Sequence, residues 1–210
     1  MKEINIIISG VGGQGNVLLE RVIGMSAIKE GYPVRAADTF GASQRGGSVL
    51  SHLRLGSEVR SSLIPQGRSH IILGLEPGEA LGAAIKFLST NGLIIVNMYP
   101  TLPAKVKVGE WIYPSAEKIS KLLSKLTPNM IKLDATALAR QVTGSERPMN
   151  LLMAGVLIAL DVIPISVGTV KKVIEQMAGN FAQESILAFE TGFKFGREKQ
   201  TTQQLDISFA

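Results

Sequence analysis

The sequence has 210 residues and contains no cysteine. This absence excludes disulfide bonds, thiolate zinc sites, cysteine-ligated iron–sulfur clusters and a cysteine nucleophile within the chain. Only two histidines occur, and neither shows the spacing of a metal site, so no metal ligand is assigned. His52 lies in an otherwise apolar segment, where we expect a hydrogen-bonded structural residue. No Ser-His-Asp set can be assembled, and the catalytic residues stay unassigned.

Charged and aromatic residues are also scarce. Charged residues make up 19% of the sequence and aromatic residues 5%, whereas about 25% charged residues is typical. The formal net charge of +5, without aromatic side chains for base stacking, argues against a nucleic-acid-binding protein. The high apolar share predicts either a deep core or a surface that a partner covers.

Long hydrophobic runs are missing. The longest uninterrupted apolar stretch covers residues 151–160, well short of the roughly 20 residues of a membrane-spanning helix. The apolar run at residues 6–8 is too short for a signal peptide. We therefore expect a cytoplasmic protein with no membrane contact. The length suits one domain, which we expect over residues 1–197, with residues 198–210 forming a polar C-terminal tail.

Short apolar segments alternate with helical patterns through the first two thirds of the chain. This alternation predicts an α/β fold with an open, mostly parallel sheet and helices on both faces. The strand at 48–55 is followed by Gly56-Ser57 and a strand-like segment at 58–64, which predicts an antiparallel hairpin insertion. The last third is expected to be helical. The expected strands are 4–9, 34–37, 48–55, 58–64, 71–75, 93–97, 111–113 and 130–133, and the expected helices are 15–30, 77–88, 115–126, 135–142, 149–160, 167–177 and 181–195.

A glycine-rich motif joins the first expected strand to the first expected helix. Residues 10–15 are Gly-Val-Gly-Gly-Gln-Gly and match G-x-G-x-x-G. Glycine lets backbone N–H groups approach an anion, and the helix N-terminus adds partial positive charge. Asp38 ends the second expected strand, near the place of a ribose-binding acid in a dinucleotide fold. The motif therefore indicates a phosphate-bearing ligand. Alternatively, the glycines serve only helix–strand packing, and Asp38 is a turn residue.

A second glycine-containing loop, Gly-Ala-Ser-Gln-Arg-Gly-Gly at residues 41–47, leaves the second expected strand. Both loops are expected at the ligand crevice of the sheet, where Ser43 and Arg45 can bind a phosphate. The alternative is a surface turn with a solvated arginine. Asn97 ends a later strand and is expected to face the same crevice. The candidate binding residues are Gly10, Gly12, Gly13, Gln14, Gly15, Asp38, Ser43, Gln44, Arg45, Gly46 and Asn97.

The motifs resemble those of a known family. The segment GVGGQGNVLLERVIG, followed by DTFGASQRGGSVLSHLRLG, resembles the gamma-type domain of the 2-oxoacid:ferredoxin oxidoreductases. The segments SSLIPQGRSHIILGLEPGEAL, NGLIIVNMYP, LDATALA and NLLMAGVLIAL agree, so the resemblance covers residues 3–195. Within the family the chain is most similar to the beta (small) subunits of the indolepyruvate branch, which the sequence SQRGG favours.

The resemblance implies an oxidative decarboxylation. A 2-oxoacid, coenzyme A and oxidised ferredoxin would give an acyl-CoA, carbon dioxide and reduced ferredoxin. Thiamine diphosphate and the iron–sulfur clusters would lie in a larger partner subunit, which agrees with the absence of cysteine here. The chain would be inactive alone, would meet ferredoxin only through the complex, and could form a homodimer when isolated.

The resemblance also implies roles for the two loops. Residues 10–15 would offer backbone donors to a phosphate-bearing group, in the first place of coenzyme A. Residues 43–46 would form the facing loop, with Arg45 countering negative charge. These contacts could instead stabilise the interface with the large subunit.

Two other functions stay open. One is a stand-alone oxidoreductase that binds NAD(P) or FAD, and the other is a purely structural subunit. The helix at 149–160 and the C-terminal helix with Phe181, Phe189, Phe193 and Phe195 are the candidates for a partner-covered surface.

Overall fold

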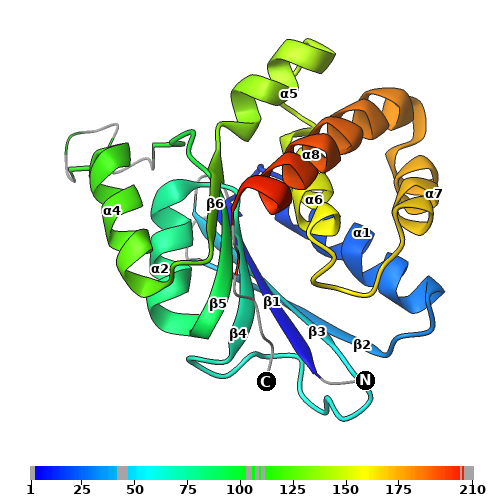
Figure 1. The fold of residues 1–210 in the computed structure, drawn as a ribbon, viewed down its shortest axis with the longest axis horizontal. Coiled ribbons are helices and arrows are strands. Elements are labelled where there is room, and N and C mark those ends of the chain that lie inside the picture. Colours follow the sequence, from blue (N-terminus) through cyan, green and yellow to red (C-terminus); the bar gives the residue numbers. More distant parts are fainter. Residues whose placement is uncertain are drawn as a thin grey trace.

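The computed structural model describes residues 3–41, 47–102, 106, 109, 112–203 and 205. A central sheet has α2 and α4 on one face and α1, α6, α7 and α8 on the other (Figure 1). The expected α/β fold with helices on both faces is thereby confirmed. The elements are β1 (Ile4–Val11), α1 (Asn16–Lys29), β2 (Val34–Phe40), β3 (Ser48–Leu55), β4 (Ser69–Gly74), α2 (Pro77–Phe87), β5 (Leu88–Asn97), α4 (Ala116–Leu126), β6 (Met130–Leu133), α5 (Ala135–Thr143), α6 (Met149–Ala159), α7 (Val167–Ala178), the short 3₁₀ helix η1 (Gly179–Phe181) and α8 (Ala182–Thr202).

The sheet has six strands in the order β2-β3-β1-β4-β5-β6. Strands β1, β4, β5 and β6 are parallel, and β3 is antiparallel to both of its neighbours, β1 and β2. Strand β2 therefore runs in the direction of β1 but is separated from it by β3. The carboxyl ends of β1, β2, β4, β5 and β6 consequently lie at one edge of the sheet, together with the start of β3.

The expected hairpin between residues 48–55 and 58–64 is wrong in its pairing. Strand β3 pairs along its whole length with β1 on one side and with β2 on the other. Because both edges of β3 are occupied, no ladder position is left for residues 58–64, which form no strand. Of the expected strand at 111–113, Trp111 lies outside the described residues, and residues 112 and 113 are not in a strand.

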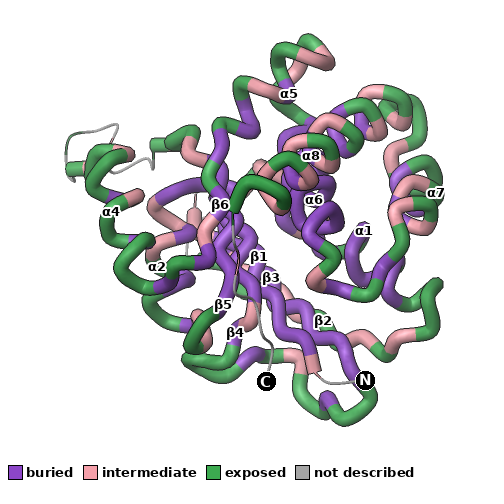
Figure 2. Tube along the Cα trace, in the orientation of Figure 1, coloured by how far each residue is buried: buried purple, intermediate pink, exposed green. Residues whose placement is uncertain are grey.

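Both faces of the sheet are apolar, which explains the continuous apolar strands of the sequence. On β1, Ile6 and Ile8 pack toward α1, α6 and α8, whereas Ile7 packs toward α2 and α4. The inner strands are buried almost throughout (Figure 2). The sheet therefore supports two separate helical layers, and the larger core lies on the side of α6.

Helix α6 is buried at all eleven of its positions. A helix that is apolar on every side needs neighbours on every side, and here α1, α5, α8 and β5 surround it. The expectation that this helix forms a partner-covered surface is therefore wrong. Phe189 of α8 is also fully buried, and Phe193 and Phe195 are half-buried against the same core. Of the four phenylalanines considered, Phe181 is the exposed one, at 57%.

Helix α8 runs through Thr202 and so extends five residues into the segment expected to be a polar tail. Its polar face keeps its mean hydropathy low. Across the described ranges, no helix combines the length and the apolar character that crossing a membrane requires.

Helices α6 and α8 touch backbone to backbone. A Cβ atom on Gly192 would lie 1.9 Å from the carbonyl oxygen of Leu152, and one on Gly155 would lie 2.0 Å from that of Phe189. We predict that Gly192→Ala lowers the free energy of unfolding by about 2–3 kcal/mol, because a rigid backbone atom occupies the space. Urea denaturation measures this.

The matched control is Gly82→Ala in the exposed face of α2, where a Cβ meets nothing within 4 Å. Alanine should stabilise that helix by about 0.5–1 kcal/mol. Equal effects of the two substitutions would contradict the close packing of α6 on α8.

Candidate functional site

The glycine loop lies at the carboxyl edge of the sheet, between the end of β1 and the start of α1. The turn closes with Gln14 N donating to Val11 O over 3.1 Å. Gly12 N donates to Gly47 O over 2.9 Å, and Gly47 directly precedes β3. The structure therefore brings the glycine loop to one end of the second loop, as the sequence predicts.

Gly15 is required by its surroundings and by its backbone conformation. Its φ angle of 83° is in the left-handed region, which favours glycine. A Cβ there would lie 2.3 Å from Nδ2 of Asn150. Asn150, at the start of α6, donates from the same Nδ2 to Gly15 O over 3.0 Å. The last glycine of the motif is thus held by a buried asparagine that is distant in the sequence.

The N-terminus of α1 faces a cavity of about 550 Å³. Helices α2, α4, α5 and α7 carry a side-chain cap, whereas the N-cap of α1 is Gly15, which has no side chain to offer. The first turn of α1 contains no acidic residue. Its leading N–H groups and its partial positive charge can therefore bind an anion. The cavity is lined by Gly12, Gly13, Gly15, Asn16, Val17, Phe40, Gly41 and Val49.

Gly13 is the most open position of the loop. Its φ is 102°, and a Cβ would meet nothing within 4 Å. Gly10 is enclosed instead, because a Cβ would lie 2.8 Å from the side-chain oxygens of both Asn16 and Gln14. Close packing therefore requires glycine at Gly10 and Gly15, whereas Gly13 has free space beside it in the cavity.

Gln14 holds the loop together from within. Its Oε1 accepts a hydrogen bond from Val11 N over 2.8 Å. Its Nε2 donates to Leu75 O over 3.3 Å and to Thr101 Oγ1 over 3.1 Å. Three of its hydrogen-bonding positions are thus used inside the chain, so Gln14 positions the loop.

Asn97 is fully buried at the end of β5 and does not line the cavity. Its Nδ2 donates to Leu75 O over 3.0 Å and to Thr136 Oγ1 over 2.9 Å. Its Oδ1 accepts from Ala135 N over 3.0 Å and from Tyr99 N over 3.3 Å. These bonds use both of its donors and both acceptor positions. Asn97 therefore connects the end of β5 to the residue after β4 and to the start of α5.

Asp38 lies on β2, and β3 separates it from β1. Two strand spacings amount to about 10 Å. Its carboxylate accepts a hydrogen bond from Ser51 Oγ and faces Glu20 of α1. The structure therefore does not bring Asp38 to the glycine loop. In a dinucleotide fold the acid stands on the strand next to β1, so this arrangement does not favour the NAD(P) or FAD alternative.

The second loop is described only at its ends. Ser43, Gln44, Arg45 and Gly46 lie outside the described residues. Gly41 lines the cavity, and its N–H donates to Ser48 O over 2.8 Å. The bonds at Gly41 and Gly47 fix the two ends of the second loop, and their donors, Gly41 and Gly12, both line this cavity.

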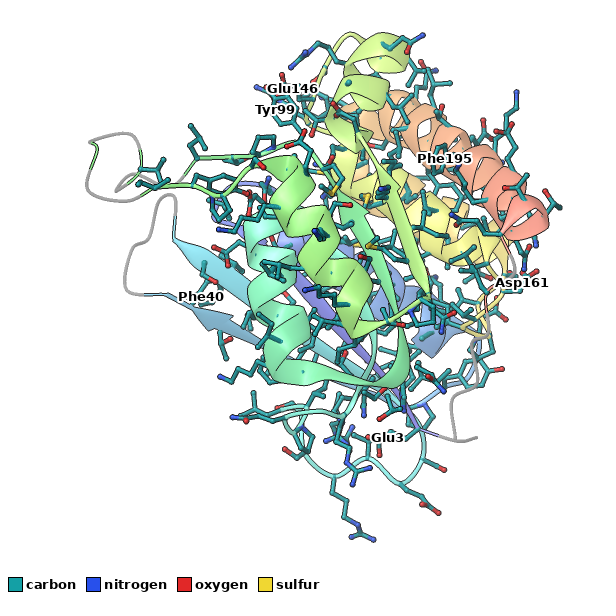
Figure 3. All side chains as sticks on the ribbon, turned by 60° about the vertical axis from the view of Figure 1, so that its left-hand side comes forward. Glu3, Phe40, Tyr99, Glu146, Asp161 and Phe195 are labelled. Carbon is teal, nitrogen blue, oxygen red and sulfur yellow. The ribbon has the colours of Figure 1, made fainter. Side chains whose placement is uncertain are left out.

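Three residues of the site escaped the sequence analysis. Asn16 is buried, and its Nδ2 donates to Val49 O over 3.3 Å. Asn150 is buried behind Gly15, and Phe40 stands exposed at the end of β2 (Figure 3). The available signals were a polar residue at the start of an apolar helix, for both asparagines, and an aromatic residue directly before a glycine loop.

A buried carboxylate stands at the same edge on the α2 face. Glu76 caps α2 by accepting from Glu79 N over 2.8 Å, and it also accepts from the Tyr113 hydroxyl. That hydroxyl accepts in turn from Gly78 N over 3.0 Å. Burial raises the pKa of Glu76. The cluster ties the segment before α4 to the first turn of α2.

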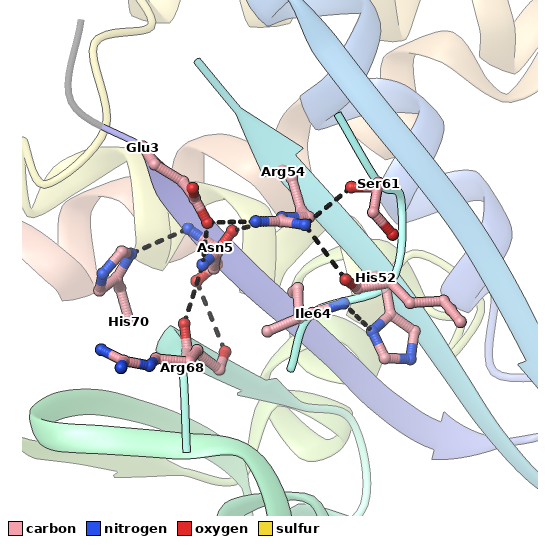
Figure 4. A network of polar contacts seen from close by, with 10 residues as sticks. Glu3, Asn5, His52, Arg54, Ser61, Ile64, Arg68 and His70 are labelled. Atoms are coloured by element: carbon pink, nitrogen blue, oxygen red, sulfur yellow. Dashed lines mark hydrogen bonds and ion pairs between the residues drawn. The ribbon is translucent and has the colours of Figure 1, made fainter. Parts of the chain in front are cut away.

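A separate polar network occupies the opposite edge of the sheet (Figure 4). The Arg54 guanidinium donates to Asn5 Oδ1 over 2.9 Å, to Ser61 O over 2.8 Å and to Leu63 O over 3.1 Å, and it pairs with Glu3. Because the guanidinium is engaged within the chain, this network stabilises the fold at the amino ends of the parallel strands.

Both histidines make structural hydrogen bonds. His52 Nδ1 accepts from Ile64 N over 3.1 Å, and its ring lies edge-on to Phe87. His70 Nδ1 accepts from Asn5 N over 2.9 Å. Burial lowers the pKa of each. The hydrogen-bonded structural role expected for His52 is confirmed.

A family model described as pyruvate ferredoxin/flavodoxin oxidoreductase matches residues 5–195. The chain belongs to this family. The indolepyruvate oxidoreductase subunit IorB of Pyrococcus horikoshii is 36% identical over 200 residues, which cover 94% of this chain and 98% of that relative. The resemblance seen in the motifs is thereby confirmed over almost the whole chain.

Solved structures agree with the family fold. A keto/oxoacid ferredoxin oxidoreductase gamma subunit from Geobacter sulfurreducens superposes with a TM-score of 0.66 at 22% identity, covering 93% of this chain and 99% of that one. A 2-oxoglutarate:ferredoxin oxidoreductase from Magnetococcus marinus, solved with 2-oxoglutarate, coenzyme A and succinyl-CoA bound, superposes with a TM-score of 0.69 at 20% identity. The whole of this chain covers 33% of that chain.

One acidic side chain of this family member, Glu20 of α1, is buried. Burial in the first place, and then the Asp38 carboxylate, raise the pKa of Glu20 to about 7. The folded chain therefore binds the proton of the Glu20 carboxyl more tightly than the unfolded chain does. The contribution of Glu20 to stability is therefore fully present below about pH 4.5 and falls as the pH rises to about 7.

We predict that Glu20→Gln raises the free energy of unfolding at pH 8 by about 2–3 kcal/mol. The gain should shrink toward pH 4.5 and vanish below it, because the wild-type carboxyl is protonated in the folded chain at pH 4.5 and becomes protonated in the unfolded chain as the pH falls further. Urea denaturation at the two pH values measures it. Glu175→Gln, at an exposed position of α7, is the control. A gain for Glu20→Gln that is equal at both pH values would contradict the burial argument.

Proposed function

We propose that the chain is the small subunit of a 2-oxoacid:ferredoxin oxidoreductase of the indolepyruvate type. The observation that carries this proposal is the 36% identity with an indolepyruvate oxidoreductase subunit over nearly the full length of both chains. In the proposed reaction, an arylpyruvate, coenzyme A and oxidised ferredoxin give an aryl-acetyl-CoA, carbon dioxide and reduced ferredoxin.

The redox cofactors of this reaction belong to a larger partner subunit in our proposal. Thiamine diphosphate supplies the carbanion chemistry of decarboxylation, and iron–sulfur clusters supply the electron transfer. This chain has no cysteine with which to ligate a cluster. Its share of the work is to complete the complex and to bind a phosphate-bearing part of coenzyme A.

The cavity at the N-terminus of α1 supports this binding role. Gly13 is open toward the cavity, and the first turn of α1 offers N–H groups beside Val17 without an acidic residue. A phosphate can accept hydrogen bonds from the leading N–H groups of such a terminus and is attracted by its partial positive charge. We propose that Arg45, with Ser43 and Gln44, adds charge and hydrogen bonds from the second loop.

A structural role for the loops is the second candidate, and a specific observation favours it. The Gly12 N–H donates to Gly47 within the chain. The Gln14 side chain is hydrogen-bonded within the chain to Val11, Leu75 and Thr101. If the loops serve only packing against the large subunit, the cavity binds no phosphate. The two candidates differ in the response of coenzyme A binding to charge at the cavity.

We expect the isolated chain to be inactive and the complex with its co-purifying large subunit to reduce ferredoxin. The pair, assayed with coenzyme A and several oxoacids, should turn over indolepyruvate and other arylpyruvates faster than pyruvate or 2-oxoglutarate. Turnover by the isolated chain would contradict the proposed division of labour. A preference for 2-oxoglutarate would contradict the arylpyruvate assignment.

We predict that Val17→Glu raises the Kd for coenzyme A in the assembled complex about tenfold. A carboxylate in the first turn stabilises the helix but repels a phosphate at the same place. Val17→Gln, of the same shape without the charge, is the control and should bind nearly as the wild type does. Calorimetry on the complex measures both. Equal Kd values for the two variants would favour the structural role.

A further inference from the structure

Phe40 is a large, exposed aromatic side chain that lines the cavity at the N-terminus of α1. It is the last residue of β2 and is 66% exposed. It lines the same cavity as Gly13 and Val17 of the first turn of α1. Figure 3 shows it at the free end of the outer strand. Removing an apolar ring from water is favourable, so a binding partner that covers this ring would gain affinity.

The register of the sheet fixes which side of the sheet the ring faces. Phe40 pairs with Val49, and Val49 pairs with Gly10 at the end of β1. Side chains two residues apart on a strand share a face. Asp38, two residues earlier, is aligned through Ser51 with Ile8 of β1, which packs toward α1. Phe40 therefore stands on the face of the sheet that carries α1, as does the anion-binding end of that helix.

The cavity consequently joins two kinds of surface. One side offers backbone N–H groups and partial positive charge at α1, and the other offers the face or edge of an aromatic ring at Phe40. This combination fits a ligand with phosphate at one end and a flat, apolar-faced group close to it. An adenine nucleotide has this form, since its base stacks on aromatic side chains whatever its hydrogen-bonding pattern.

We infer that Phe40 is the stacking platform for the adenine ring of coenzyme A. The inference rests on the proposed function, which places the phosphates of coenzyme A at α1, and it assigns the base to the end of β2, which lines the same cavity. Phe40 thereby selects for the nucleotide half of coenzyme A, whereas the pantetheine arm is free to extend toward the partner subunit.

The test uses the purified complex of both subunits and three probes. These are coenzyme A, adenosine 3′,5′-bisphosphate, which keeps the adenine half, and 4′-phosphopantetheine, which lacks it. Phe40→Ala should raise the Kd of the first two probes about tenfold, a loss within the range found for one base–aromatic stack. It should leave the Kd of 4′-phosphopantetheine unchanged.

Two further variants separate stacking from general burial and from folding effects. Phe40→Leu keeps an apolar side chain but loses the ring, so it should behave like Phe40→Ala, whereas Phe40→Trp should keep the wild-type Kd. Phe181→Ala removes a comparably exposed ring, 57% against 66%, that does not line this cavity. It should leave all three Kd values unchanged.

Several outcomes would overturn the inference. Unchanged binding of adenosine 3′,5′-bisphosphate to Phe40→Ala would refute stacking, and so would wild-type affinity in Phe40→Leu. If Phe40→Ala lowers the yield of the complex but not the affinity for any probe, the ring packs against the partner subunit. If the wild-type complex binds none of the probes, the proposed coenzyme A site itself fails, and the inference fails with it.

Discussion

Helix α6 meets α8 with glycine facing backbone, and the position of the glycine loop depends on this contact. Cβ atoms at Gly155, Gly192 or Gly196 would lie within 3 Å of the facing helix, so the two helices can lie only where glycine leaves room. The first turn of α6 then carries Asn150 to the carbonyl of Gly15. Buried polar groups keep such hydrogen bonds because losing one costs about 1–3 kcal/mol. The α6–α8 contact therefore fixes the start of α1 from behind.

The sequence predicts the layers of this fold well and one of its strand pairings badly. Continuous apolar strands such as Ile4–Val11 need cover on both faces, and the helical periods between them supply that cover. The partner of a strand is decided by contacts distant in sequence. Strand β3 has the turn signal Gly56-Ser57 on its C-terminal side, yet β1 and β2 occupy both of its edges. A local signal could not show that those edges were taken.

The same limit applies to the candidate site. Residue type and spacing place Gln14, Asn97 and Asp38 near strand ends, and each is there. Whether a polar side chain is available to a ligand depends on internal partners that no motif reports. Asn97 has all of its positions filled within the chain. Phe40, an apolar residue that no phosphate motif includes, faces the cavity instead.

These internal hydrogen bonds fix the conformation of the glycine loop, which the glycine motif alone does not explain. Gln14 and Asn150 bond to the backbone of the loop at Val11 and Gly15, and Asn16 ties the start of α1 to β3 at Val49. Gly13 and the first turn of α1 stay open to the cavity. Donors that are already fixed lose little conformational entropy when an anion binds. The low charge and high apolar content of the sequence belong to the same arrangement, because α6 must be apolar to be buried and the buried α6 holds Asn150 in place. The chain thus uses its core to preorganise a small polar edge, which agrees with the proposed role of a subunit that binds part of coenzyme A and leaves the redox chemistry to its partner.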